Sequence, residues 1–270
     1  MLPILLHLLP ASIYLGLAAA WKYTGGQTSA LQRNLAQWGL LIAVVLHGFT
    51  LLGDLDGTGE PRFGFSVALS MTLWLAMAFY WLESFFAPIQ GLQALAMPVA
   101  AVATLLPTFF PGQHALPDMG STAFRVHFIV AMLAYSLLTL AALHALMMVA
   151  AERQLHSARL TRALSALPPL LVLENLLFRL VGSGFALLTL TVGSGVFFSE
   201  ALFGKPLTFN HKTVFGIAAW IVFGTLLLGR AAWGWRGRRA LRLTLAGFVC
   251  LLLAYVGTRF VLEVILGRPG

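Results

Sequence analysis

Long apolar runs alternate with short polar stretches along the whole chain. Runs of membrane-spanning length fall at about 3–21, 35–53, 65–83, 92–107, 124–150, 176–199, 212–230 and 241–266. The run at 92–107 is short and contains Pro98, so we expect a tilted or broken helix there. The pattern predicts an all-α integral membrane protein: a bundle of about eight transmembrane helices forming a single domain over residues 1–270.

Composition agrees with this pattern and narrows the function classes. Hydrophobic residues make up 59% of the 270 positions and charged residues only 10%, too apolar a mixture for a soluble core. The net charge of +8 is concentrated in short connections, which indicates membrane orientation rather than nucleic-acid binding. Cys250 is the one cysteine, which excludes an internal disulfide, a Cys-x-x-Cys pair and covalent haem attachment. No basic segment precedes the first run, so we expect it to remain as the first membrane helix.

Basic residues occur in alternate connections. The first, fifth and seventh connections hold Lys22, Arg33, Arg153, Arg159, Arg162, Arg236, Arg238 and Arg239. The positive-inside rule therefore places the odd connections in the cytoplasm, with the even connections and both termini outside. "WGWRGRR" (233–239) is expected to anchor the cytoplasmic interface.

Two histidines are expected at the outer face. His127 ("AFRVHFIV") and His211 ("TFNHKTVFG") lie near the starts of the fifth and seventh spans, which both run from outside to inside. The positive end of a helix dipole favours the neutral imidazole, the form that donates a lone pair to iron. The pair could ligate a haem iron from both sides. The alternative is that each ring is a polar anchor at the headgroup level.

The other histidines fall into different settings. His47 lies about four to six residues from the outer end of the second span, where it either ligates a metal or bonds a backbone carbonyl. His7 has no polar neighbour in sequence and is expected to pack. His144 lies about 26 Å along the helix from His127, near the cytoplasmic side, and is not expected to share its site. His114 and His156 are expected to be solvated in connections.

Two further patterns have structural interpretations. "DLDGTGE" (54–60) superficially resembles a calcium loop but lacks its ligand spacing, so turn residues in a solvated loop are expected. The small residues of "VGSGF" (181–185) and "TVGSG" (191–195) suit close helix packing, and the Gly-x-Gly spacing has no strand that would make it a nucleotide loop.

Several segments together resemble the cytochrome c assembly superfamily, in the branch of YpjD-like and HemX-like inner-membrane proteins related to CcsA and CcmC. The similar segments are "RFGFSVALSMTLWLAMAFYWLES" (62–84), "VHFIVAMLAYSLLTLAALHAL" (126–146), "LPPLLVLENLLF" (167–178), "GFALLTLTVGSG" (184–195), "NHKTVFGIAAWIVFG" (210–224) and "GWRGRRALRLTLAGFVCLLLAYVGTRFV" (234–261). The resemblance implies haem held on the outer face by two histidines that flank a tryptophan-rich loop. His127 matches the first through His-x4-Met followed by Ala-Tyr-Ser, and His211 matches the second. His47 resembles the in-membrane histidine of the second span.

The chain departs from the family pattern at two places. The connection "EALFGKPLTFN" (200–210) contains no tryptophan, so the "WWD" signature is missing. The histidine that often precedes "GWRGR" is also missing, since Leu228, Gly229 and Arg230 stand there. The first departure bears on haem presentation to an apocytochrome, and the second on a haem relay through the membrane.

The resemblance implies a haem-handling protein of the bacterial cytoplasmic (inner) membrane, acting in cytochrome c assembly or tetrapyrrole homeostasis. Haem b is expected as a bound cofactor or cargo, with His127 and His211 as iron ligands and His47 as a further haem-binding residue. The expected partners are haem, the lipid bilayer and other cytochrome c biogenesis membrane proteins, but no nucleic acid. No catalytic constellation is apparent in the spans, so we do not expect an enzyme. The alternatives are a divalent-cation transport component and a non-catalytic partner or regulatory protein.

Overall fold

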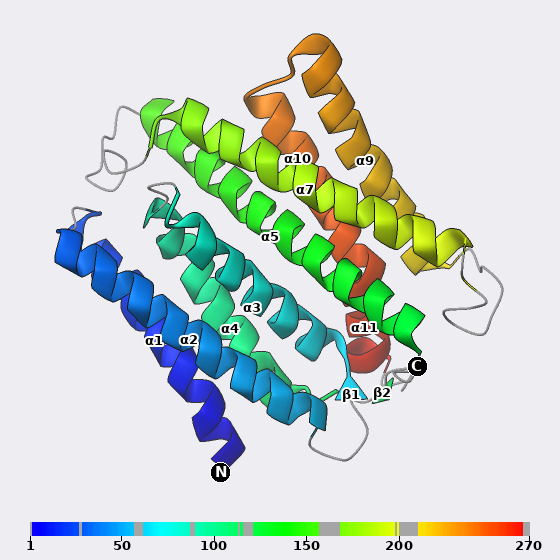
Figure 1. Ribbon diagram of the computed structural model, residues 1–270, viewed down its shortest axis with the longest axis horizontal. Coiled ribbons are helices and arrows are strands. Elements are labelled where there is room, and N and C mark those ends of the chain that lie inside the picture. Colours follow the sequence, from blue (N-terminus) through cyan, green and yellow to red (C-terminus); the bar gives the residue numbers. More distant parts are fainter. Residues whose placement is uncertain are drawn as a thin grey trace.

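Long helices lie side by side through the molecule (Figure 1). The computed structural model describes residues 2–26, 29–56, 62–86, 90–112, 114–115, 121–156, 168–197, 199 and 210–266. The elements are α1 (Leu2–Thr24), α2 (Ala30–Asp56), β1 (Arg62–Phe63), α3 (Phe65–Glu83), η1 (Gln90–Leu92), α4 (Gln93–Phe109), β2 (His114–Ala115), α5 (Thr122–His156), α7 (Leu170–Phe197), α9 (His211–Trp233), α10 (Arg238–Leu252), η2 (Leu253–Gly257), α11 (Thr258–Phe260) and η3 (Val261–Ile265).

The all-α membrane fold predicted from the sequence is confirmed. Within the described residues, 7 segments are helical, long and apolar enough to cross a membrane, and α4 is a shorter apolar helix of 17 residues. The last of the seven segments runs through α10, η2, α11 and η3 as one span over Arg238–Ile265. β1 and β2 add only a two-residue antiparallel pair, in which Phe63 is opposite His114.

Several boundaries differ from the prediction. α4 continues past Pro98 and Pro107 as one helix, so the expected break at Pro98 does not occur. α7 begins at Leu170 rather than near 176, so Glu174 lies within the helix. α2 continues to Asp56, and Asp54 therefore belongs to a helix rather than to a loop. Residues 57–60 of the acidic segment lie outside the described residues.

Long helices that are consecutive in the chain run antiparallel, as pairs of contacts between them show. Between α3 and α2, Trp74 Nε1 donates to Val44 O at 2.8 Å and Trp81 Nε1 donates to Gln37 O at 3.1 Å. Between α9 and α7, Trp220 Nε1 donates to Thr189 Oγ1 at 2.9 Å, and Gly224 lies against Phe185. α5 and α7 also run antiparallel, while α5 is parallel to α3 because Phe128 packs on Phe63 and His144 lies beside Glu83.

The bundle consequently has two ends, which we name by their residues. The histidine end holds the starts of α5 and α9, with His127 and His211, together with the start of α1 and the end of η3. The arginine end holds the connection between α9 and α10, with Arg236 and Arg238. The start of α1 and the end of η3 thus lie at the same end of the bundle, which fits an even number of crossings (Figure 1).

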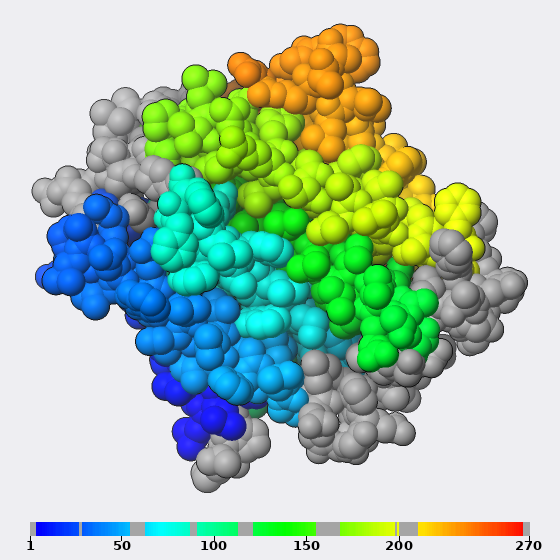
Figure 2. Space-filling model, viewed as in Figure 1, coloured from blue at the N-terminus to red at the C-terminus, as the bar shows by residue number. Residues whose placement is uncertain are grey.

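Burial is concentrated between the helices, and large apolar side chains cover the outside. Tyr14, Tyr80 and Phe223 are among the largest fully buried side chains. Leu228 on α9 and Phe49 on α2 are instead 69% and 66% exposed. Figure 2 shows the helices packed across one broad face, from α2 in blue through α3, α5 and α7 to α9 in orange. This apolar exterior is the surface expected of helices whose solvent is lipid.

Candidate functional site at the histidine end

His127 lies in the second turn of α5 and contacts the last turns of α7. Its Nδ1 is 2.7 Å from Ser194 Oγ. The Ser194 hydroxyl has one hydrogen, and its other contacts are carbonyl oxygens, Leu190 O at 2.7 Å and Thr191 O at 3.1 Å. Since carbonyls only accept, a serine that donates to the backbone accepts from the ring. In that arrangement His127 carries its hydrogen on Nδ1.

Glycine lets α7 lie close to this ring. A Cβ added at Gly195 would lie 3.7 Å from His127 Cε1. About three helical turns earlier on α7, a Cβ at Gly184 would come within 2.7 Å of Leu138 Cγ. The predicted role of these two glycines in close helix packing is thus confirmed, whereas Gly182 and Gly193 face open space.

His211 is the first residue of α9. Asn210 caps this helix, its Oδ1 accepting the backbone N–H of Thr213 at 3.1 Å. The His211 side chain is exposed, at a helix start where the peptide dipoles disfavour an imidazolium. The structure therefore places both predicted outer histidines near helix starts at the same end of the bundle.

An aromatic cluster lies between the helices that carry them. Phe63 of β1 packs edge-on against Phe128 of α5 at 5.2 Å between ring centroids, and against Tyr255 of η2 at 5.9 Å. Phe124 stacks on Phe128 at 6.3 Å. Lys212, next to His211, lies over the Tyr255 ring at 5.6 Å from its centroid. Through Phe128 and Lys212, the chain neighbours of His127 and His211, the cluster links the start of α5 to the start of α9.

Charged groups from the last span lie beside this cluster. Lys212 interacts electrostatically with both Arg259 and Glu263. Glu263 Oε2 accepts the backbone N–H of Phe65 at 3.2 Å, and so caps α3, whose own residue Gly64 has no side chain to do so. The turns that carry Tyr255 and Glu263, η2 and η3, are π-helical, a geometry frequently found at functional sites. Two cations and one carboxylate thus lie beside the aromatic cluster.

His47 lies on α2 inside the bundle, and both of its ring nitrogens contact side-chain hydroxyl groups. It is 0% exposed. Its Nε2 is 2.9 Å from Ser70 Oγ, and its Nδ1 is 3.3 Å from Thr104 Oγ1 and 3.4 Å from Tyr14 Oη. The sequence left open a metal or a backbone carbonyl as the partner; the partners are side-chain hydroxyls from α1, α3 and α4. His47 is also nine residues from the end of α2, farther from it than expected, because α2 extends to Asp56.

The expectation that His7 packs without a polar neighbour is wrong. His7 Nε2 is 3.1 Å from Asp54 Oδ2. The pairing follows from the extension of α2, which brings Asp54 onto the helix face that carries His47. Tyr14 lies seven residues after His7, just as Asp54 lies seven residues after His47. A separation of seven residues places both members of each pair on one helix face. This matched spacing in the sequence could have indicated two polar contacts, one above the other, between the antiparallel helices α1 and α2.

His144 lies far along α5 from His127, as its position in the sequence indicates, and it has a partner that the sequence did not reveal. The ring is 0% exposed. Nδ1 is 2.9 Å from Leu140 O, and Nε2 is 3.5 Å from Glu83 Oε2 at the end of α3. His114 lies in β2 and His156 ends α5; their predicted solvation is not tested.

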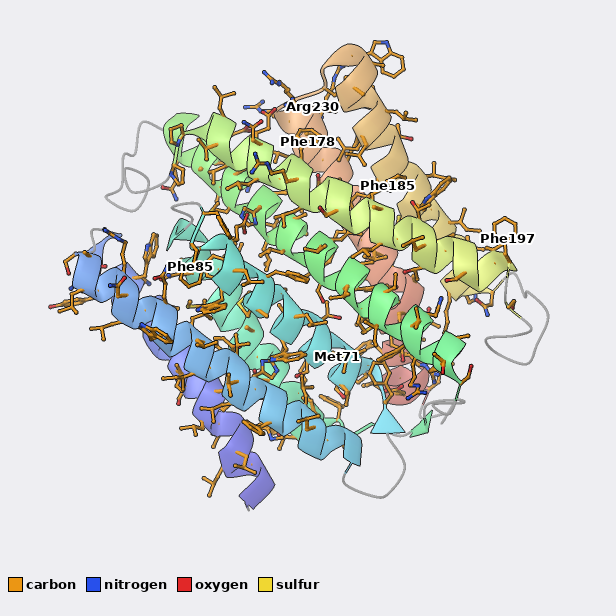
Figure 3. All side chains as sticks on the ribbon, viewed as in Figure 1. Met71, Phe85, Phe178, Phe185, Phe197 and Arg230 are labelled. Atoms are coloured by element: carbon orange, nitrogen blue, oxygen red, sulfur yellow. The ribbon has the colours of Figure 1, made fainter. Side chains whose placement is uncertain are left out.

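At the arginine end, basic side chains form ion pairs that join helices; the predicted anchoring of this segment at the membrane interface stays a prediction. Arg230 Nη1 contacts Glu174 Oε1 at 2.8 Å and Arg236 Nε contacts it at 3.2 Å, which joins α7 to α9 and its following turn. The Arg230 guanidinium also lies 4.5 Å from the Phe178 ring centroid, and Figure 3 shows both side chains near this end. Arg238 pairs with Glu152 at 3.4 Å.

The alternative of a metal ion bound by side chains alone has no supporting site among the described residues. Within them, no group of three or more His, Cys, Asp or Glu side chains lies close enough together to hold a metal ion. Most of the connection at 200–210, where the tryptophan-rich motif is missing, lies outside the described residues.

Comparisons with known proteins give the chain a family. The model described as "Cytochrome C assembly protein" matches residues 33–266. The 28.8 kDa protein in the nifR3-like 5' region of Azospirillum brasilense is 33% identical over 270 residues, covering 97% of this chain and 96% of that protein. Inner membrane protein YpjD of Escherichia coli is 35% identical over 166 residues, 62% of each chain. Cytochrome c biogenesis protein CcsA of Gloeobacter violaceus is 32% identical over 91 residues, 34% of this chain and 27% of CcsA.

No solved structure matches the chain. The family model nevertheless omits only residues 1–32, with α1 and the first three residues of α2, and residues 267–270, so it includes every helix of the histidine end except α1. The chain therefore belongs to the cytochrome c assembly protein family.

Proposed function

We propose that this membrane protein binds haem b, as cofactor or cargo, through His127 and His211 at the outer face of the bacterial cytoplasmic membrane, and acts in cytochrome c assembly or tetrapyrrole homeostasis. It works by binding rather than by catalysis. The family supports a role in haem handling. The names of the relatives, an inner membrane protein and a cytochrome c biogenesis protein, support the location and the process.

The contact between His127 and Ser194 carries this proposal. A hydrogen bond from one ring nitrogen fixes the tautomer and orientation of a metal-ligating histidine. At His127 the 2.7 Å contact between Nδ1 and Ser194 Oγ supports the tautomer with its hydrogen on Nδ1, the one in which Nε2 is the donor atom for iron. The serine cannot reverse this arrangement without giving up its bond to Leu190 O. Interfacial anchoring alone does not require such a fixed tautomer.

The surroundings suit the rest of a haem group. When bound, haem supplies an iron that takes histidine nitrogens as axial ligands, within an apolar ring that carries carboxylates. Phe63, Phe128 and Tyr255 present aromatic surface near His127. Lys212 and Arg259 provide cations for carboxylates, beside Glu263, whose Oε2 accepts the backbone N–H of Phe65. Each class of contact that haem needs is therefore represented at the histidine end.

His47 has a supporting role in this proposal. Both of its ring nitrogens face hydroxyl groups, so ligation of iron would break contacts that join α1, α3 and α4 to α2. His47 holds the helices below the haem site in register. Other cytochrome c biogenesis membrane proteins are the proposed partners in haem delivery.

The test is absorption spectroscopy of the purified full chain in mild detergent, reduced and oxidised, with a pyridine haemochrome assay. We expect a sharp b-type spectrum in the wild type and its loss in His127→Ala and in His211→Ala. His47→Ala is expected to keep the band positions with a lower haem yield, because it loosens the bundle without removing a ligand. His156→Ala, at the opposite end of α5, is the matched control.

Two results would overturn the proposal. One is a wild-type protein that stays colourless after haem supplementation. The other is a b-type spectrum unchanged in both His127→Ala and His211→Ala, which would place any bound haem elsewhere.

A further inference from the structure

A histidine and a glutamate face one another inside the bundle, away from the histidine end. His144 lies on α5 and Glu83 is the last residue of α3. The His144 side chain is 0% exposed and that of Glu83 12% exposed, and their Nε2 and Oε2 atoms are 3.5 Å apart. Both atoms are buried without a hydrogen-bond partner. Neither group takes part in the proposed haem site.

The backbone fixes the state of one nitrogen of this ring. His144 Nδ1 lies 2.9 Å from the carbonyl oxygen of Leu140, one turn earlier on α5. A carbonyl oxygen only accepts, so Nδ1 carries a hydrogen. In the neutral ring, Nε2 then has a bare lone pair, and this lone pair faces a carboxylate oxygen. Two acceptors facing each other in a buried site repel and leave both unsatisfied.

One proton removes this conflict. It can be carried by Glu83, whose carboxylic acid then donates to Nε2, or by Nε2, whose imidazolium then pairs with the carboxylate. The 3.5 Å separation is at the long limit of a hydrogen bond, and a small side-chain rotation closes it. Either form gives a neutral pair overall, which is the form that a low-dielectric interior favours.

The groups around the pair do not offer another counter-charge among the described residues. From α3, Tyr80 faces Glu83 and makes a side-chain hydrogen bond with Gln93 of α4. The other carboxylates near this end are paired with arginine: Glu152 of α5 with Arg238 of α10, and Glu174 of α7 with Arg230 and Arg236. Within the described part of the chain, Glu83 has neither a lysine nor an arginine as a partner.

We propose that Glu83 and His144 form a proton-binding site that takes up one proton from the aqueous phase at the arginine end and holds it between Oε2 and Nε2. Glu83 is the entry group, because it retains some exposure while His144 has none. Uptake adds a proton to the pair, and release returns the proton to water, with no change of oxidation state. The pair thus forms a buried group whose charge changes by one unit, independent of haem.

The experiment uses the full chain in lipid nanodiscs, with histidine labelled with ¹⁵N in both ring nitrogens. ¹⁵N NMR distinguishes a protonated nitrogen from one with a bare lone pair, and infrared spectroscopy detects the carbonyl stretch of a protonated carboxylic acid. The His144→Gln spectrum assigns the resonance. Glu83→Gln is the central variant, because its amide N–H donates to Nε2 and satisfies the ring without a titrating group.

The expected result is one pair-bound proton at neutral pH in the wild type. It is seen either as a protonated Nε2 or as a carboxylic acid band that Glu83→Gln lacks. Raising the pH releases one proton per chain more from the wild type than from Glu83→Gln. Glu152→Gln, which removes a carboxylate paired with a largely exposed arginine, is expected to titrate as the wild type does.

Other outcomes would overturn the proposal. One is a bare Nε2 at neutral pH together with an ionised Glu83. Another is stoichiometric Zn²⁺ in the wild type that is absent from both variants, which would make the pair a metal site. If Glu83→Gln does not fold, His144→Gln is compared with the wild type instead. It retains the titratable carboxyl of Glu83, so the readout is the protonated Nε2 resonance or the position of the carboxylic acid band, and a wild type that lacks the first and shares the second with His144→Gln would overturn the pairing.

Discussion

At the residue scale, the contact between Ser194 Oγ and Nδ1 orients the His127 ring beside α7. Three other histidines have different partners: a carboxylate for His7, hydroxyls for His47, a backbone carbonyl and a carboxylate for His144. The roles proposed for these side chains, iron ligation, packing and proton binding, differ because the groups that contact each ring nitrogen differ.

A substitution at Ser194 tests this at the haem site. Ser194→Ala removes the hydrogen-bond acceptor for His127 Nδ1 and leaves the ring free to change tautomer and to rotate. Loss of such a supporting contact weakens metal binding by about 10–100-fold. The measurement is haemin affinity, by absorption titration of the apoprotein in detergent. Ser183→Ala, at an exposed position of the same helix, is the control. Equal affinities in both variants would show that Ser194 does not position the ring.

At the element scale, α5 is the central helix, since it packs against α3, α7 and α10. Its contact with α7 depends on Gly184, where α7 has no side chain to keep Leu138 at a distance. This contact sets the position of α7 along α5, and with it the position of Ser194 beside His127.

Enlarging Gly184 should therefore disturb both stability and the site. Gly184→Leu forces side-chain atoms into the space of Leu138 and is expected to lower stability by about 1–3 kcal/mol. Thermal unfolding in detergent, followed by size-exclusion chromatography, measures the change in melting temperature. The control is Gly182→Leu, whose Cβ meets nothing within 4 Å. A Gly184→Leu protein as stable as Gly182→Leu would contradict the assigned packing.

At the scale of the whole molecule, the two ends differ in what their charges do. At the arginine end, Arg236 and Arg238 remain 58% and 63% exposed even though each pairs with a carboxylate. At the histidine end, Lys212 and Arg259 lie within the bundle beside Glu263. Exposed arginines are the feature that holds a connection in the cytoplasm, so the histidine end is predicted to face outward.

Reporter fusions test this orientation. Alkaline phosphatase, which is active only outside the cytoplasm, is expected to be active when fused after Gly270 and inactive when fused after Arg239. Green fluorescent protein at the same two positions should give the opposite pattern. Phosphatase activity at Arg239 with none at the C-terminus would invert the molecule. The proposed haem site would then lie on the cytoplasmic side.

Much of this architecture followed from the sequence alone. The periodic apolar runs determined the fold class and the approximate helices, because a segment surrounded by lipid must satisfy its backbone hydrogen bonds within itself. The order of the spans then placed His127 and His211 at one end and His144 toward the other. The resemblance of several segments determined the family, which the match over residues 33–266 confirms.

Only the tertiary structure decided which groups meet across helices. The apolar pattern did not predict that α2 extends to Asp54, which contacts His7, or that the end of α3 places Glu83 beside His144. The hydroxyls around His47 come from three separate helices. Hydropathy reports how long a helix is, but barely constrains its rotation and sliding against its neighbours. Those two quantities, set by small residues such as Gly184, determine each histidine's partner and therefore its chemistry.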